Sequence, residues 1–344
     1  MPESPDYAAM RLALPAVHRL AGSIGAKCRH SVVIIDPTTM NRDTVNESHQ
    51  PRRGHRRPVT RAVGAGDSAP TGHRPAERGV LRRRLLEFSA VCLVLTWIPW
   101  ALLGVLGVSV DEGPGSLVFA LAASGPSLAA LVMWLRHRGE SRPGPRTRWS
   151  LGAPAVAVLL GGIAPGGAAV LMNLTDLPAI PQHAGSVIAD VGGPLIALAY
   201  TLLAGPVAEE FGWRGYVQPR LRRSCSRMAT TMVLGAAWGL WHVPLYFLPG
   251  TGQHDTGLFT HQGLVFFLGL LPLTHLMLFV TERLRGGVPA AILMHAAWNL
   301  TDELVPPLGT GGQWLKLLLL SATAAVVGLL WLRATPVSQR HPDS

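Results

Sequence analysis

The stretch that decides the fold is residues 187–216, VIADVGGPLIALAYTLLAGPVAEEFGWRGY. Residues 187–208 are mostly apolar, and a helix of about 20 such residues crosses the hydrocarbon core of a bilayer. Two adjacent carboxylates, Glu209 and Glu210, follow directly, and Arg214 comes soon after. An ionisable side chain in a transmembrane helix costs roughly 2.5–3.5 kcal/mol on insertion scales, so we expect these residues to have a function.

The composition of the whole chain is typical of a membrane protein. Of its 344 residues 48% are hydrophobic and 15% are charged, whereas soluble domains average about 25% charged residues. The net charge of +10 is uneven, because residues 1–84 hold 15 basic and 7 acidic residues while residues 85–344 hold 15 and 13. We therefore predict a disordered basic N-terminal arm over residues 1–84, and we expect no nucleic acid partner.

Apolar runs of spanning length recur along the rest of the chain. We predict an all-α, polytopic membrane helical bundle of about eight transmembrane helices, at residues 88–108, 116–135, 151–172, 187–208, 228–248, 263–280, 287–305 and 314–332. With the N-terminus inside, 14 of the 15 basic residues after position 84 fall in cytoplasmic loops, Lys316 being the exception. The sequence thus predicts a transmembrane domain over residues 85–333, a short tail over 334–344, both termini cytoplasmic, and a location in the plasma membrane.

The charged residues behind the fourth predicted span have spacings that are meaningful on a helix. Glu210 and Arg214 are four residues apart, so they lie on one face and can form an ion pair. Glu209 is rotated from that face by about 100°, which leaves its carboxylate free for another partner. The pair alone is typical of a structural contact.

Two further spans carry polar residues at the same spacing. Trp238 precedes His242 by one helical turn in the fifth span, and His295 precedes Asn299 by one turn in the seventh. Taken singly, each polar residue has a structural explanation, such as a buried core histidine or an amide bonded between helices. Two carboxylates, two histidines and an amide on three spans favour one polar cluster in the interior of the bundle.

Several enzyme classes are excluded by motifs that the sequence lacks. There is no HExxH, no GxxxxGK[ST] loop and no GxSxG elbow, which excludes soluble zinc proteases, P-loop ATPases and the common serine hydrolases. Cys28, Cys92 and Cys225 lie far apart and predict neither a disulfide framework nor a thiolate metal site.

Read in order, the motifs Glu209-Glu210-xxx-Arg214, Trp238-xxx-His242 and His295-xxx-Asn299 resemble those of the CAAX prenyl protease and bacteriocin-immunity family of intramembrane proteases. The resemblance covers about residues 190–305, and its most specific part is the context AEEFGWRGY. One departure is Trp238, which stands where phenylalanine is more usual.

The resemblance implies an intramembrane endopeptidase that acts on a membrane-anchored peptide or protein, such as a prenylated CAAX-type substrate. It implies that Glu209, assisted by His242, activates a water, that His295 and Asn299 face the oxyanion, and that the pair Glu210–Arg214 supports the site. A carboxylate and two histidines, Glu209, His242 and His295, could equally bind Zn²⁺ with an open fourth position, as in a metalloprotease. The sequence leaves both mechanisms open.

Two other functions compete with proteolysis. A non-catalytic scaffold or regulator of the same family would have the same fold, although every motif residue is present. A proton-coupled transporter could use the carboxylates and histidines as a relay, but transporters commonly show repeated halves, and no such repeat is visible.

The predicted depths of two site residues disagree. Glu209 lies at the cytoplasmic end of its predicted span, whereas His242 lies about 14 residues, or roughly 21 Å, into the next. Either the fourth span reaches deeper than its hydropathy indicates, or residues 215–227 form an interfacial helix and the fifth span begins late.

Overall fold

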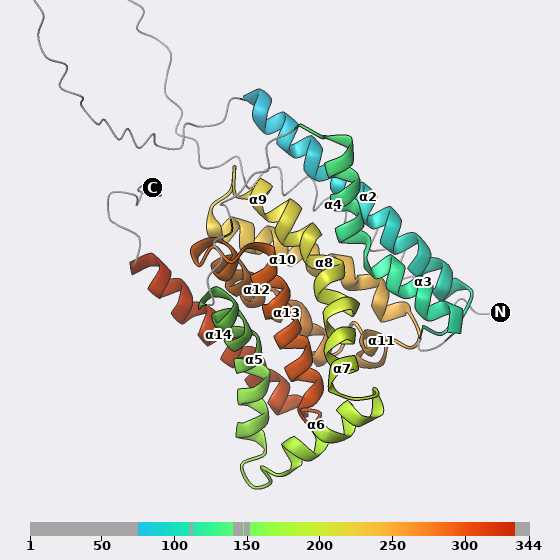
Figure 1. Ribbon diagram of the computed structural model, residues 1–344, viewed down its shortest axis with the longest axis vertical. Coiled ribbons are helices and arrows are strands. Elements are labelled where there is room, and N and C mark those ends of the chain that lie inside the picture. Colours follow the sequence, from blue (N-terminus) through green and yellow to red (C-terminus); the bar gives the residue numbers. More distant parts are fainter. Residues whose placement is uncertain (1–74, 111–112, 140–146, 148–151, 334–344) are drawn as a thin grey trace, which may run out of the picture.

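The computed structural model describes residues 75–110, 113–139, 147 and 152–333, and each regular element in these ranges is a helix (Figure 1). The all-α prediction is confirmed for this part of the chain. Residues 1–74 of the predicted arm and the predicted tail, 334–344, lie outside the described residues. The first described helix, α2 (Pro75–Val105), begins within the range predicted for the arm.

The helices fall into three consecutive groups. The first contains α2, α3 (Gly113–Ala123), α4 (Gly125–Arg136), α5 (Gly152–Met172) and α6 (Ala179–Asp190). The second is one long helical stretch, made of α7 (Pro194–Leu202), η1 (Leu203–Val207), α8 (Ala208–Gly212), η2 (Trp213–Val217) and α9 (Gln218–Leu221). The third contains α10 (Arg227–His242), η3 (Val243–Phe247), α11 (Gly252–Thr256), α12 (His261–Leu278), η4 (Phe279–Arg283), α13 (Gly287–Leu304) and α14 (Thr310–Arg333). Here η1, η2 and η4 are π-helical turns, and η3 is a 3₁₀ turn.

Within the described residues, five helices are long and apolar enough to cross a membrane: Arg78–Val105, Gly152–Met172, Pro194–Leu221, His261–Arg283 and Thr310–Arg333. A sixth results if α3 and α4, which are bent by 49°, count as one broken span. The prediction of about eight spans is therefore too high by this measure. The other two predicted spans are helical, but α10 has only 16 residues, about 24 Å at 1.5 Å per residue, and α13 carries polar side chains of the site. The protein is an integral membrane protein with several candidate spans.

The fourth predicted span differs most from its prediction. Its helix begins at Pro194 and continues past both glutamates to Leu221. Glu209 therefore lies inside a candidate spanning helix and not at its end, as the first of the two arrangements considered above, the deeper fourth span, requires. An interfacial helix over residues 215–227 is wrong, because residues 215–221 continue the long helix and α10 begins at Arg227.

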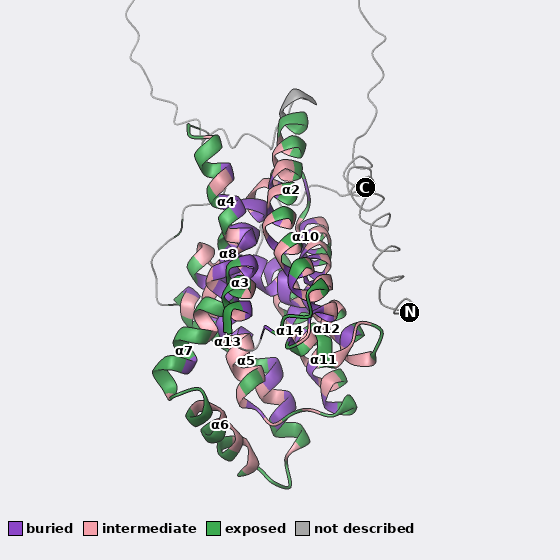
Figure 2. Ribbon diagram, turned by 90° about the vertical axis from the view of Figure 1, so that its right-hand side faces the viewer, coloured by how far each residue is buried: buried purple, intermediate pink, exposed green. Residues whose placement is uncertain are grey.

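The core draws buried residues from most of the helices, and Figure 2 shows them concentrated in the middle of the bundle. The closest helix–helix approach in this region depends on Gly161 of α5. A Cβ at this position would lie 2.3 Å from the carbonyl oxygen of Met294 on α13, which no larger residue could tolerate without moving the helices. This approach places α13, and with it the neighbouring His295, against the rest of the bundle.

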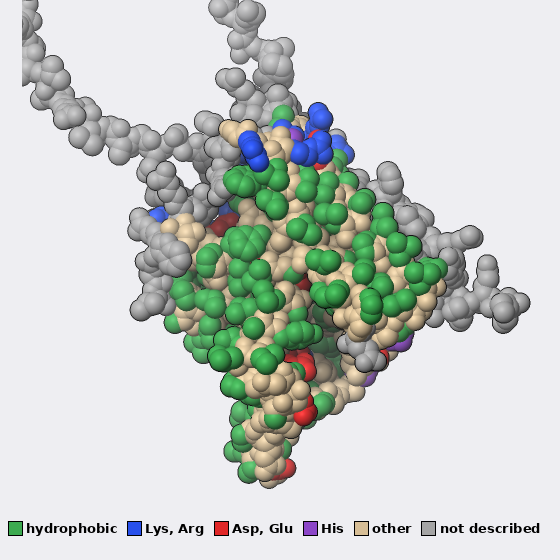
Figure 3. Space-filling model, turned by 45° about the vertical axis from the view of Figure 1, so that its right-hand side comes forward, with side chains coloured by type: hydrophobic (Ala, Val, Ile, Leu, Met, Phe, Trp, Pro, Cys, Tyr) green, Lys and Arg blue, Asp and Glu red, His purple; other side chains and the backbone are tan. Residues whose placement is uncertain are grey.

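The surface is divided by residue type. Figure 3 shows hydrophobic side chains over the flank, Lys and Arg side chains gathered at one end, and Asp and Glu side chains toward the other end. Many large apolar side chains are exposed to the surroundings, among them Leu195 at 81% and Phe259 at 87%. A flank of this kind is suited to contact with lipid, and a basic end is the pattern expected of the cytoplasmic side.

Candidate functional site

A cavity of about 230 Å³ lies between the long helix α7–α9 and the helices α2, α3, α10, α11, α12 and α13. Its walls are mostly aromatic and aliphatic, and the carboxylate, imidazole and amide side chains that line it are Glu209, His242, Gln253, His295 and Asn299. Four of these five residues are those predicted from the sequence to be catalytic. Trp238 also lines the cavity, so all three motif-bearing helices meet there.

The two carboxylate oxygens of Glu209 have different surroundings. The side chain is buried, with 6% of the residue exposed. Its Oε2 accepts a hydrogen bond from the indole Nε1–H of Trp238 at 2.6 Å. Its Oε1 lies on the side of Gly205, one helical turn earlier. One oxygen is therefore held in place, and the other is free to accept a hydrogen bond from a ligand.

Gly205 marks the point where the polar groups converge. A Cβ on Gly205 would lie 3.3 Å from Asn299 Nδ2, 3.6 Å from Glu209 Oε1 and 3.8 Å from His295 Nε2. Because glycine has no side chain, the space among these three atoms is left open. It is suited to a water molecule or a substrate carbonyl group in contact with all three.

His295 is oriented from behind the cavity by the second glutamate. Its Nδ1 donates to Glu210 Oε1 at 2.8 Å, and the same oxygen accepts from Arg214 Nη1 at 2.9 Å. The ion pair predicted between Glu210 and Arg214 is thus present, and both of these side chains are fully buried. Since Nδ1 of His295 is engaged with a carboxylate, its Nε2 is the nitrogen presented to the cavity.

Trp238 connects the two glutamates. The guanidinium of Arg214 lies over its indole ring, 4.1 Å from the centroid, in the geometry of a cation–π contact. The edge of the same indole donates to Glu209. The phenylalanine that is usual at this position could provide the ring face but not the N–H group, so the departure from the motif adds a hydrogen bond to the candidate base.

His242 is fixed by its own helix and by aromatic rings. Its Nδ1 lies 2.8 Å from the carbonyl oxygen of Trp238, so we assign the proton to Nδ1, since a carbonyl can only accept. Trp241 and Phe266 pack edge-on against the ring, with centroids 4.7 Å and 5.1 Å away. Nε2 is therefore the nitrogen of His242 that can interact with a ligand.

Sequence patterns found the polar residues but not every feature that joins them. The spacing predicted the Glu210–Arg214 pair and the separate direction of Glu209. It did not predict the bond from His295 to Glu210, nor the role of Gly205. The sequence could have indicated Gly205, because it lies four residues before Glu209 and therefore on the same helix face.

A metal does not fit this arrangement of side chains. Among the described residues, no three His, Cys, Asp or Glu side chains are grouped so that they could hold a metal ion. Zn²⁺ binding by Glu209, His242 and His295 remains a prediction from the sequence that this geometry does not support, and we derive no step through it.

The fold and the site together define a polytopic helical membrane protein whose buried site contains carboxylate, imidazole and amide side chains. Residues 191–301, which contain the glutamates, histidines and asparagine of this site, match the family model described as Type II CAAX prenyl endopeptidase Rce1-like. The resemblance predicted from the motifs is therefore confirmed: this segment of the chain is similar to the Rce1-like family of type II CAAX prenyl endopeptidases.

One curated relative extends this likeness. The chain is 32% identical over 113 residues to CAAX prenyl protease 2 of Methanococcus maripaludis. The match covers 32% of this chain and 41% of the relative, so the chain spans about two fifths of the length of the curated relative it matches.

Proposed function

We propose that this protein is an intramembrane endopeptidase that hydrolyses a peptide bond in a membrane-associated substrate. The observation that carries the proposal is the convergence of Glu209 Oε1, His295 Nε2 and Asn299 Nδ2 around Gly205, inside a buried cavity. The likeness of residues 191–301 to type II CAAX prenyl endopeptidases supports it. These groups are the types of side chain that peptide hydrolysis needs, namely a base for water and donors for an oxyanion.

In the proposed mechanism Glu209 is the general base. A water molecule beside Gly205 donates a hydrogen bond to Oε1 of Glu209 and loses this proton as it attacks the scissile carbonyl carbon. His242 assists by accepting a second hydrogen bond from this water at Nε2. When the tetrahedral intermediate collapses, Glu209 returns its proton to the leaving amine, so that no proton is gained or lost overall.

The oxyanion of the intermediate is stabilised by the other two groups at Gly205. Asn299 donates from Nδ2, and His295 donates from Nε2 when its ring is doubly protonated. Glu210 then balances the positive charge of the ring through the 2.8 Å contact at Nδ1. Donors already aimed at a developing oxyanion each contribute about 2.7–4 kcal/mol in other hydrolases. In this mechanism Glu210, Arg214 and Trp238 are positioning residues.

The substrate we propose is a peptide held at the membrane, of which a prenylated CAAX-type C-terminus is the first to test. The apolar flank supports access from the bilayer, and the relative's name supports the prenylated class. A non-catalytic scaffold and a proton-coupled transporter are the alternatives that the same experiment must distinguish.

The test is cleavage of a library of prenylated and otherwise lipid-anchored peptides by the purified full-length protein in proteoliposomes, with and without a chelator. We expect cleavage at a defined bond, which mass spectrometry of the products identifies. Equal rates with and without chelator would support the mechanism without metal, whereas loss of activity on chelation and recovery with Zn²⁺ would overturn it. Folded protein that cleaves no peptide would favour the scaffold, and proton-coupled uptake into the vesicles would favour transport.

Trp238→Phe tests the hydrogen bond that holds Glu209. The ring beneath Arg214 is retained, while the N–H group that donates to Oε2 is removed. A hydrogen bond to a charged group contributes about 1.5–3 kcal/mol, so we expect kcat/KM to fall on the order of tenfold or more. An unchanged kcat/KM for the folded variant would contradict the positioning role of Trp238.

Gly205→Ala tests whether the open space at Gly205 is the reaction site. The added methyl group would lie 3.3 Å from Asn299 Nδ2 and within 4 Å of Glu209 Oε1 and His295 Nε2. We expect the cleavage rate to fall at least tenfold, because the added methyl group takes the space of the water and of the substrate carbonyl oxygen. The temperature of thermal unfolding should not be lower than that of the unaltered chain. Gly166→Ala on α5 is the control, because its added Cβ meets an ordinary contact of 3.5 Å with Thr301. Equal activity of the two variants would contradict the assignment.

A further inference from the structure

A row of buried polar side chains runs along the long helix just outside the lining of the cavity. We call Glu210, Arg214 and Gln218 the polar row. They are four residues apart, so they lie on one face of the helix, and they are 0%, 3% and 2% exposed. None of the three lines the cavity. Glu210 and Arg214 contact cavity residues, His295 and the ring of Trp238 respectively, whereas Gln218 has no place in the proposed mechanism.

Each member of the polar row has buried atoms that are left without a hydrogen-bond partner among the described residues. These atoms are Glu210 Oε2, Arg214 Nε and Nη2, and Gln218 Oε1. The first and last are acceptors, and the two between them are donors. The row thus presents acceptor, donor, donor and acceptor in order along one helix face.

Such atoms do not stay unpaired in a membrane-spanning helix. Leaving a buried polar group unsatisfied in the absence of water costs more free energy than immobilising an ordered bridging water. Water molecules can donate to both acceptors and accept from both donors. The helix here also contains the π-helical turn η2, a feature that is frequent at functional sites.

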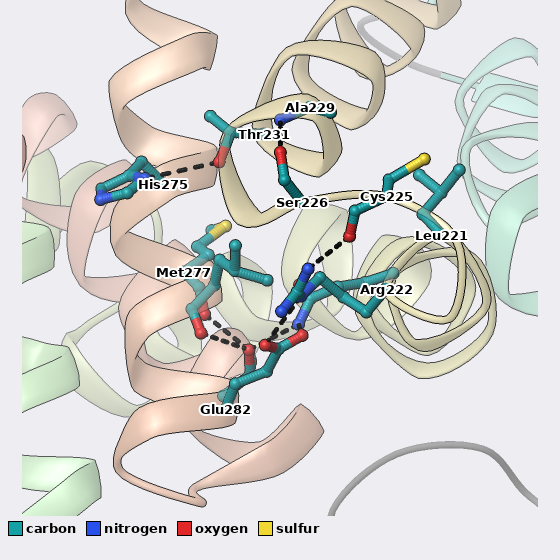
Figure 4. Close-up of polar contacts among 12 residues, drawn as sticks. Leu221, Arg222, Cys225, Ser226, Ala229, Thr231, His275, Met277 and Glu282 are labelled. Atoms are coloured by element: carbon teal, nitrogen blue, oxygen red, sulfur yellow. Dashed lines mark hydrogen bonds and ion pairs between the residues drawn. The ribbon is translucent and has the colours of Figure 1, made fainter. Parts of the chain in front are cut away.

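The two ends of the polar row reach different places. At the inner end, Glu210 contacts His295, which lines the cavity. At the outer end, Gln218 Nε2 donates to Thr281 Oγ1 at 2.7 Å. Beside it lies the ion pair of Arg222 and Glu282, with an Nε–Oε2 distance of 3.0 Å (Figure 4). The side chains of that pair are 25% and 17% exposed, so solvent reaches this end of the row.

We propose that the polar row is a buried water-binding site, a chain of bound water molecules that runs from the Arg222–Glu282 pair to Glu210. The ligand is water, and the atoms that hold it are the two unpaired acceptors and two unpaired donors of the row. The chain hydrates the buried Glu210–Arg214 pair and connects the back of His295 to solvent by a route separate from the cavity. This inference does not depend on peptide hydrolysis, so its failure and the failure of the proposed function are distinguishable.

The experiment is hydroxyl-radical footprinting of the full-length protein in nanodiscs, with radicals generated from water by radiolysis. Gln218→Met places an unbranched, readily oxidised side chain in the polar row. Leu276→Met, at a position that is 0% exposed on α12, is the matched control. Native Met133, also 0% exposed, reports in each sample whether the protein is folded. We expect oxidation at position 218 to be at least tenfold faster than at position 276, with Met133 protected in both variants.

Oxidation at position 218 as slow as at position 276 would overturn the proposal, because a dry buried side chain meets few radicals. If Gln218→Met does not fold, Trp213 of the unaltered chain is the second probe. Its Nε1 is buried, has no partner among the described residues, and belongs to the residue beside Arg214. Rapid oxidation of Trp213 relative to Met133 supports the water chain, and equal protection of both contradicts it.

Discussion

Glu209→Gln is expected to abolish measurable cleavage while leaving the protein folded. The amide oxygen can still accept the hydrogen bond from Trp238 that Glu209 Oε2 accepts at 2.6 Å in the structure, and the side chain keeps its size. What is lost is a carboxylate able to take a proton from water at the Gly205 space. General-base catalysis contributes about 10²–10⁴-fold to the rate. We therefore expect the single-turnover rate constant for cleavage of a lipid-anchored peptide to fall by at least about 10²-fold.

The shorter acid, Glu209→Asp, is the matched variant. It keeps the carboxylate but withdraws it from Gly205, so we expect an activity between those of the unaltered chain and Glu209→Gln. Intrinsic tryptophan fluorescence during thermal unfolding checks that all three proteins are folded, because Trp238 contacts the altered side chain. Cleavage by Glu209→Gln at the rate of the unaltered chain would remove Glu209 from the mechanism and favour another base.

Local patterns in the sequence were sufficient wherever one helix determines the outcome. The spacing of Glu210 and Arg214 predicted their ion pair, and the phase of the helix predicted that Glu209 points elsewhere. Contacts between helices were not predictable in this way. The bond from Trp238 to Glu209 joins residues 29 positions apart, and the bond from His295 to Glu210 joins residues 85 positions apart. These bonds depend on how α8, α10 and α13 pack together, which the local sequence pattern does not show.

Hydropathy misjudged the extent of the helices for a related physical reason. It ends a span at the first charged residues, so it placed Glu209 at the end of the fourth. In the structure Glu210 and Arg214 form an ion pair inside the protein, and the helix continues to Leu221. Hydropathy also counted α10 and α13 as spans, although α10 is short and α13 is partly polar, because apolar residues that face protein and lipid look alike in a sequence.

Arg214→Met is expected to cause the largest loss of stability among the changes considered. In the unaltered chain both side chains of the pair are 0% exposed. The substitution therefore leaves the carboxylate of Glu210 buried without its cation. Removing one partner of a buried ion pair costs about 3–5 kcal/mol. For a domain of this size that corresponds to a fall in the unfolding midpoint on the order of 10 °C, which tryptophan fluorescence of the purified protein measures. Cleavage should fall as well, because His295 and the ring of Trp238 both lose support.

The double variant Arg214→Met/Glu210→Gln separates charge from shape. It removes both charges, and the amide oxygen of the new side chain can still accept from Nδ1 of His295. Replacing a whole buried pair is often neutral, so we expect it to recover most of the lost stability while cleavage stays low, since no carboxylate balances the charge of the His295 ring. If the double variant were as unstable as Arg214→Met, size and packing rather than an unpaired charge would explain the loss. If it cleaved at the rate of the unaltered chain, His295 would not need Glu210, and the oxyanion would have to be stabilised by Asn299 alone.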